Sequence, residues 1–195
     1  LLMAAVQYAE HPGYSALILR RSYADLALPG ALMDVSRKWW GCTDARWNAQ
    51  EHKWTFPSGA TVQFGYLENP GDETRYQSAE FHFVGFDEVT QFAEDQYLFL
   101  FSRLRRKATS GLPLRMRSAG NPGGVGHEWA KRRFVNRETR EIGAEFVAAR
   151  IQDNPGIDAE AYERNLRRLD PVRCQQLLAG DWDVRPAGAM FRREP

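Results

Sequence analysis

Short apolar runs alternate with stretches of helical periodicity along the 195-residue sequence. The uninterrupted apolar runs at residues 15–19 and 81–86 are typical of strands buried on both faces of a sheet. Residues 114–118 alternate apolar and basic side chains, as a half-buried strand does, and residues 145–151 are expected to form a further strand. Strands separated by helices favour an α/β fold, in which helices cover both faces of a mainly parallel sheet.

Helical periodicity and capping residues predict helices between and after these strands. The helices are expected at residues 1–9, 26–40, 94–104 and 127–134. Asp158 and Asp170 are typical helix N-caps, and the second is followed by proline at the favoured first helical position. Gly180 is expected to end the last helix. The chain therefore finishes in two capped helices.

Two segments rich in glycine and proline predict turns. Pro57-Ser58-Gly59 lies between short apolar segments, which favours a hairpin of residues 53–56 and 60–64. Residues 120–126 contain four glycines and one proline, too many for a regular helix or strand. A loop is therefore expected directly after the strand at residues 114–118.

Composition limits the class of protein. With 195 residues, 43% of them hydrophobic, the sequence is long enough for one substantial domain with a buried core. No apolar run approaches the roughly 18 residues that span a bilayer, and no signal-peptide pattern is present. We therefore expect a soluble, cytosolic protein. Cys42 and Cys174 lack metal-site or disulfide-framework spacing and are expected to be buried thiols.

The formal net charge of +1 hides two segments of opposite charge. Residues 66–100 carry eight acidic side chains and one basic side chain, a net charge of −7. Residues 101–140 carry eleven basic and two acidic side chains, a net charge of +9. The near-zero total excludes only a uniformly basic protein, and a local nucleic-acid surface is compatible with the second segment.

Two adjacent carboxylates, Asp87 and Glu88, follow the predicted buried strand at residues 81–86. They fall at the carboxyl edge of the sheet, where open α/β folds bind ligands. Nucleoside triphosphate hydrolysis needs one group to hold Mg²⁺ and another to orient and deprotonate a water molecule. The same pair could instead end the strand and cap the next helix, so the pattern alone leaves both interpretations open.

Asn121 follows the predicted strand at residues 114–118 and begins the Asn-Pro-Gly-Gly segment of the loop. An asparagine at this place could report on a γ-phosphate by hydrogen bonding, and the glycines let backbone N–H groups approach an anion. A loop selected only for its turn geometry is the alternative. The order of an apolar strand, Asp-Glu, a helix, a basic strand and an Asn loop favours the functional interpretation.

Four segments carry a family resemblance that extends over almost the whole chain. They read FPSGATVQFG, FHFVGFDEVTQFAEDQYLFLFSRLRR, SAGNPGGVGHEWAKRRF and LLAGDWDV. In this order they closely resemble the ATPase domain of the large terminase subunit, the DNA-packaging motor of tailed bacteriophages and prophages. The resemblance implies a P-loop NTPase fold of the additional-strand, catalytic-glutamate class, with ATP and Mg²⁺ as cofactors.

The resemblance also assigns roles to individual residues. Asp87 would be the Walker B ligand of Mg²⁺, and Glu88 the catalytic carboxylate that polarises water for attack on the γ-phosphate. Ser118, Gly120 and Asn121 match the coupling motif, which links hydrolysis to movement of DNA.

Arg20 and Arg21 follow the predicted strand at residues 15–19. At that place an arginine could stabilise transition-state charge, and Arg21 is the candidate. A solvated or acid-paired pair of arginines is the alternative.

The family pattern also contains parts that this sequence lacks. A P-loop, GxxxxGK[ST], is expected before the helix at residues 1–9, and no such motif occurs in the sequence. We therefore expect residues 1–180 to form an ATPase domain without its N-terminal strand and P-loop, and to be inactive alone. Residues 181–195 would form a linker toward a nuclease domain, with residues 188–191 approaching its first strand. Asp181 and Asp183 are interpreted as structural.

Partners follow from the same resemblance. They would be double-stranded DNA, the portal protein, the small terminase subunit and further copies of the subunit in a ring. The protein would act in the host bacterial cytoplasm and transiently at the procapsid portal. Lys131, Arg132 and Arg133 would contact the DNA backbone, although a solvated helix face explains the same charges.

Two other functions use the same residues. A helicase-like P-loop motor shares the strand followed by Asp-Glu, but no late arginine motif typical of helicases is present in this sequence. A nucleic-acid-binding or assembly module without catalysis would use only the basic segment.

Overall fold

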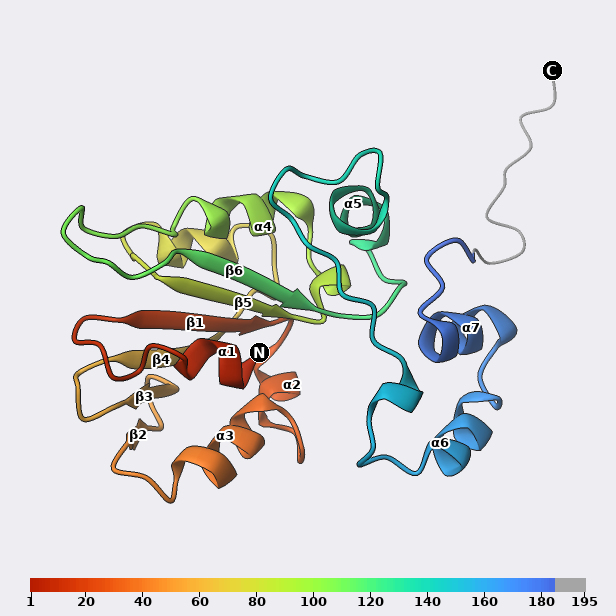
Figure 1. The fold of residues 1–195 in the computed structure, drawn as a ribbon, viewed down its shortest axis with the longest axis horizontal. Coiled ribbons are helices and arrows are strands. Elements are labelled where there is room, and N and C mark those ends of the chain that lie inside the picture. The colour runs from red at the N-terminus through yellow and green to blue at the C-terminus, as the bar shows by residue number, and fades with distance from the viewer. Residues whose placement is uncertain (185–195) are drawn as a thin grey trace. The chain divides into compact units, whose positions relative to one another are not determined.

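The computed structural model describes residues 1–184, and these form two compact units (Figure 1). Unit 1 is Leu1–Gly120, and unit 2 begins at Asn121. The predicted division between residues 180 and 181 stays a prediction. The expected approach to a nuclease strand, at residues 188–191, lies outside the described residues.

Unit 1 is a six-stranded sheet with helices on both faces (Figure 1). The strand order is β2-β3-β4-β1-β5-β6; β4, β1, β5 and β6 are parallel, and β2 and β3 antiparallel. The strands are β1 (Ser15–Arg20), β2 (Arg46–Asn48), β3 (Lys53–Thr55), β4 (Thr61–Tyr66), β5 (Phe83–Asp87) and β6 (Arg115–Ala119). The helices are α1 (Leu2–Val6), α2 (Tyr23–Ala27), α3 (Leu32–Trp40) and α4 (Glu94–Phe101), with short 3-10 helices η1 (Asp72–Tyr76) and η2 (Val89–Gln91).

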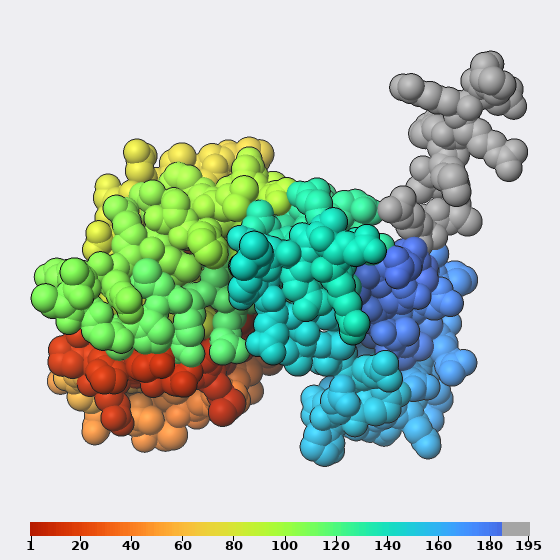
Figure 2. Space-filling model, turned by 45° about the horizontal axis from the view of Figure 1, so that its top comes forward, coloured from red at the N-terminus to blue at the C-terminus, as the bar shows by residue number. Residues whose placement is uncertain are grey.

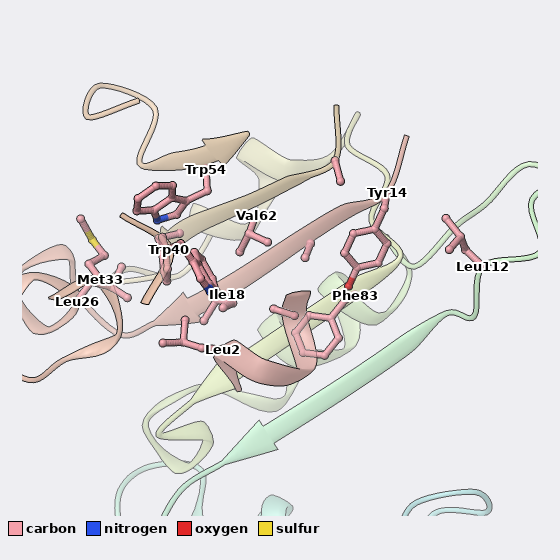
Figure 3. Close-up of a cluster of buried hydrophobic side chains, with 14 residues drawn as sticks. Leu2, Tyr14, Ile18, Leu26, Met33, Trp40, Trp54, Val62, Phe83 and Leu112 are labelled. Carbon is pink, nitrogen blue, oxygen red and sulfur yellow. The ribbon is translucent and has the colours of Figure 1, made fainter. Parts of the chain in front are cut away.

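The central strands β1 and β5 are apolar on both faces because both faces are covered. In β1, Ile18 faces a core formed with α1, α2 and α3, and Figure 3 shows Leu2, Trp40 and Trp54 around it. On β5, Phe86 packs against Tyr97 of α4, with ring centroids 5.2 Å apart. The predicted α/β fold with a mainly parallel, helix-covered sheet is confirmed.

The strand register fixes which residues meet at the carboxyl edge of the sheet. Leu19 of β1 pairs with Phe86 of β5, so the next residues of the two strands, Arg20 and Asp87, lie side by side. Phe86 also pairs with Ser118 of β6. Three parallel strands therefore end together, and the loops that follow them leave from one edge.

The beginning of the chain packs against the last strand of the sheet. In the space-filling view the first residues, in red, lie directly against the green surface that contains residues 105–120 (Figure 2). The Arg115 guanidinium donates to Gln7 Oε1 at 2.7 Å and lies 4.8 Å from the Tyr8 ring centroid. This contact holds the end of α1 beside β6.

Two local predictions in unit 1 need correction, and one strand was not predicted. The single helix expected at residues 26–40 is two helices, because the chain turns at Pro29-Gly30, where proline and glycine disfavour helix. The strand β2 has only three residues and was not predicted. Cys42 is exposed in the turn after α3 and is a free thiol, as is the half-buried Cys174 of unit 2. The hairpin of β3 and β4 is confirmed.

Unit 2 contains short helices and no strand within residues 121–184. They are α5 (His127–Ala130), the π-helix η3 (Lys131–Val135), the 3-10 helix η4 (Ile151–Asp153), α6 (Ala159–Leu166) and α7 (Pro171–Ala179). Asp158 accepts from the Ala161 N–H and Asp170 from the Arg173 N–H, so both predicted N-caps are confirmed. Gly180 ends α7 as predicted.

The strand predicted at residues 145–151 is wrong. These residues are irregular up to η4, and Val147 is 77% exposed. A strand must exchange backbone hydrogen bonds with a neighbouring strand. The described part of unit 2 contains no neighbouring strand, so the local apolar pattern alone does not produce a strand here.

Candidate functional site

An ion pair joins the ends of the two central strands. The Arg20 Nη1 atom lies 2.6 Å from Asp87 Oδ2, and both side chains are about four-fifths buried, with 22% and 17% exposed. Arg20 and Asp87 end β1 and β5, whose parallel register brings them together. A carboxylate bound to arginine is thus fixed at the carboxyl edge of the sheet.

Burial and charge act on Asp87 in opposite directions. Burial raises the pKa of Asp87 above its ordinary value, because desolvation disfavours the charged form. The Arg20 guanidinium and the amino group of Leu1 lower this pKa and offset part of the effect. The start of the chain therefore lies close enough to Asp87 to act on it electrostatically.

Glu88 has an unusual backbone conformation. Its φ and ψ angles are both 54°, in the left-handed region, and within residues 1–184 only His52 shares a positive φ among non-glycine residues. A residue with a side chain pays roughly 1–2 kcal/mol to adopt this conformation. The left-handed conformation lies between β5 and η2, at the point where the chain leaves the sheet.

Gly120 packs against this turn from the end of β6. A Cβ atom added at Gly120 would lie 3.0 Å from the Val89 backbone nitrogen and 3.4 Å from the Cα of Glu88. Only a residue without a side chain allows the two backbones this close. Gly120, which is predicted to belong to the coupling motif, thus lies against the backbone of Glu88.

The structure brings most of the predicted site residues of unit 1 to one edge. Ser118 lies in β6 and Gly120 directly after it, beside Asp87 and Glu88, since Asp87 pairs with Ala119 in the register. Arg21 lies apart from this group, because its Nη1 donates to the Leu67 carbonyl oxygen at 3.1 Å. Arg20 is the arginine that contacts Asp87, so the acid-paired alternative is realised for it.

Asn121 is the first residue of unit 2 and is the covalent neighbour of Gly120. The loop that it begins, residues 121–126, is held within unit 2. The Arg173 Nη1 donates to the Pro122 carbonyl oxygen at 3.3 Å, and the Gly123 N–H donates to His127 Nδ1 at 2.9 Å. His127, at the start of α5, is therefore bonded to the backbone of the loop that precedes it.

Residues expected to bind DNA form ion pairs inside unit 2. The Lys131 Nζ lies 2.6 Å from Asp183 Oδ1, and Arg133 pairs with Glu141. Arg132 is exposed. Lys131 and Arg132 also line a cavity of about 220 Å³ beside the π-helix η3, and π-helical segments are frequent at functional sites.

The donor set at the sheet edge suits a metal only in part. Within residues 1–184 no group of three His, Cys, Asp or Glu side chains is placed to hold a metal ion. Mg²⁺, however, is commonly bound by one or two carboxylates together with substrate phosphates and water. Asp87 and Glu88 therefore fit the carboxylate part of a Mg²⁺ site that phosphate and water would complete.

Comparisons with known proteins identify the family. The family model described as "Terminase large subunit, T4likevirus-type, N-terminal" matches residues 8–194. The chain belongs to the terminase large subunit family. No curated protein sequence matches it. None of the helices formed by the described residues combines the length and apolarity needed to cross a membrane.

Solved terminase structures share the fold of this family member. The large terminase from a thermophilic bacteriophage matches with a TM-score of 0.68 and 14% identity, over 93% of this chain and 43% of that chain. The complex of the same terminase with ADP matches with a TM-score of 0.65 and 14% identity, over 93% and 43%. Its complex with ATP-gamma-S has the same TM-score and identity, over 93% and 42%. The chain thus spans less than half the length of these terminases.

Proposed function

We propose that this chain is part of an ATP-hydrolysing motor that moves double-stranded DNA into a procapsid. The observation that carries the proposal is the pair Asp87 and Glu88 at the carboxyl edge of a parallel sheet, with Glu88 held at a positive φ. Strained backbone of this kind is concentrated at functional sites. Membership of the terminase family supports the assignment.

In this proposal Glu88 orients and deprotonates the attacking water, and Asp87 holds Mg²⁺. When bound, Mg²⁺ would neutralise charge on the β- and γ-phosphates of ATP. Glu88 is half-buried, so its carboxylate can meet water while the turn fixes its direction. Arg20 holds Asp87 in a defined orientation, as the 2.6 Å contact indicates.

The coupling motif completes the proposed site. Ser118 and Gly120 connect the edge of β6 to Asn121, which would sense the γ-phosphate by hydrogen bonding. Because Gly120 contacts the backbone of Glu88, a shift of the catalytic turn would be passed to Asn121 through one peptide bond. Arg21 could stabilise transition-state charge only after its hydrogen bond to the Leu67 carbonyl oxygen is broken.

The phosphate loop would come from sequence before Leu1 in a longer protein. The position of Leu1 supports this arrangement, because a Cβ atom added at Gly85 of β5 would lie 3.5 Å from Leu1 Cδ2, so a loop preceding α1 would fall near the end of β5. This would supply the backbone N–H groups and the lysine that cradle phosphates.

Binding of the DNA backbone is assigned to Lys131, Arg132 and Arg133 together, since all three follow the loop at residues 121–126 and Arg132 is exposed. A backbone contact of this type is independent of sequence and weakens with salt. The portal protein, the small terminase subunit and a ring of copies in the host cytoplasm remain proposed partners and surroundings.

The experiment compares Glu88→Gln with the unchanged sequence in a protein extended upstream through a P-loop. We expect ATP hydrolysis to fall by a factor of roughly 100 or more, as for loss of a general base, with nucleotide binding kept. The 195-residue chain alone should hydrolyse ATP negligibly. Hydrolysis that survives the substitution would contradict the proposal, and DNA binding without any hydrolysis would favour the non-catalytic alternative.

A further inference from the structure

His127 is bonded to the backbone at both ring nitrogens. Its Nδ1 accepts from the Gly123 N–H at 2.9 Å, and its Nε2 lies 3.1 Å from the Trp182 carbonyl oxygen. Because Nδ1 accepts, the ring proton lies on Nε2, which donates to that carbonyl. The rings of His127 and Trp182 also stack, with centroids 5.3 Å apart and an angle of 29°.

Helix α7 holds the same loop from another side. The Arg173 Nη1 donates to the Pro122 carbonyl oxygen, and Gln176 Nε2 donates to the Val184 carbonyl oxygen at 3.4 Å. At Gly123, where φ is 106°, an added Cβ would lie 2.7 Å from the Arg173 guanidinium and 3.0 Å from Gln176 Oε1. Helix α7 therefore contacts both the loop at residues 121–126 and the segment at residues 181–184, which follows the helix.

The segment at residues 181–184 is itself fixed. Asp181 Oδ1 accepts from the N–H groups of Asp183 and Val184, at 2.8 and 3.3 Å. The Asp183 carboxylate pairs with Lys131 of η3. The loop at residues 121–126 and the segment at residues 181–184 are thus both held by hydrogen bonds of their own. The His127 side chain between them is only 11% exposed.

We propose that His127 is a positioning residue that connects the loop at residues 121–126 to the segment at residues 181–184. A change in the loop is passed through the imidazole to the Trp182 backbone. The relevance of this connection to motor function rests on the proposed role of Asn121, because Asn121 begins the loop. Neutral histidine is suited to the task, since it accepts at one nitrogen and donates at the other in a rigid ring.

The test measures amide hydrogen exchange by NMR at both ends of the connection, in the 195-residue chain. His127→Asn keeps an acceptor near Nδ1 and loses the donor to Trp182, whereas His127→Gln keeps a donor near Nε2 and loses the acceptor. We expect each variant to speed exchange at both Gly123 and Asp183, by roughly 2- to 10-fold, as loss of one hydrogen bond gives. If each variant affects only the end whose bond it removes, the connection is overturned.

The control is Asp158→Ala, which removes the N-cap of α6 outside this network and should change neither amide selectively. If the histidine variants do not fold, the protonation of the two His127 ring nitrogens is measured by NMR in the unchanged chain instead. Nitrogen-15 shifts should report an unprotonated Nδ1 and a protonated Nε2, and a proton on Nδ1 would overturn the proposal. Neither measurement depends on ATP hydrolysis, so this inference and the proposed function can fail separately.

Discussion

The guanidinium of Arg20 lies 2.6 Å from the carboxylate of Asp87 at the ends of two neighbouring parallel strands. Arg20 ends β1 and Asp87 leads into the turn at Glu88, so this pair links two residues that lie 67 positions apart in the sequence. An arginine in this place stabilises the ionised carboxylate that burial disfavours. It also holds in a fixed direction the oxygen atoms proposed to meet Mg²⁺.

Arg20→Gln should raise the pKa of Asp87 further, because the guanidinium lowers it in the unchanged chain. Burial already raises this pKa, so the folded state binds the proton more tightly than the unfolded state. Stability therefore falls as pH rises between the ordinary pKa and the raised one. In the variant this loss of unfolding free energy with rising pH should be larger. The difference from the unchanged chain should be about 1–3 kcal/mol at neutral pH, since a charged hydrogen bond is lost.

Urea denaturation in mildly acidic and in neutral buffer measures this difference. Arg21→Gln is the matched control, because Arg21 donates to a carbonyl oxygen and not to a carboxylate. Its effect on the free energy of unfolding should be similar in the two buffers. An equal pH dependence for both variants would show that the ion pair contributes nothing specific.

Glu88→Gly should raise the free energy of unfolding by up to about 1 kcal/mol, because glycine adopts a φ of 54° without the side-chain penalty. Glu88→Gln keeps a side chain of nearly the same size together with the strain, so it should be less stable than Glu88→Gly. Both substitutions should abolish the proposed hydrolysis in a protein that contains the P-loop. Thermal unfolding of the 195-residue chain checks the first two outcomes, and a less stable glycine variant would contradict the strain.

Gly120→Ala should destabilise unit 1 by roughly 1–3 kcal/mol, since the new methyl group meets backbone atoms of Glu88 and Val89 that cannot rotate away. Gly111→Ala is the control, because a Cβ atom there meets nothing within 4 Å. The control should leave stability unchanged or slightly raised. Denaturant midpoints of the two variants test the contact, and equal midpoints would exclude it.

Tyr14→Phe should leave stability unchanged or raise it by about 1 kcal/mol, because removing an unsatisfied buried hydroxyl costs little. Tyr14 is 1% exposed, its hydroxyl has no hydrogen-bond partner among the described residues, and burial raises its pKa to about 12. Tyr76→Phe is the contrast, because burial raises the pKa of Tyr76 equally but its hydroxyl bonds to the Tyr66 backbone, so its loss should destabilise. Differential scanning calorimetry compares the two.

Much of the fold could be predicted because local pattern and tertiary environment agree. The runs around Ile18 and Phe83 are apolar in both alternating sets of positions, and only a strand covered on both faces buries both sets. The N-caps Asp158 and Asp170 are equally local, since each bonds to an N–H three residues away. The strand predicted from the apolar pattern at residues 145–151 is wrong, because a strand also needs a neighbouring strand from elsewhere in the chain.

The sequence by itself determined the α/β class, the adjacent carboxylates Asp87 and Glu88 and the family resemblance, since these depend on residue types and their order. Only the tertiary structure decided that Arg20, and not Arg21, pairs with Asp87. It also decided that Glu88 has a positive φ and that Gly120 lies against its backbone. The physical reason is that strand register and close backbone approach depend on packing across the sheet, which no single segment encodes.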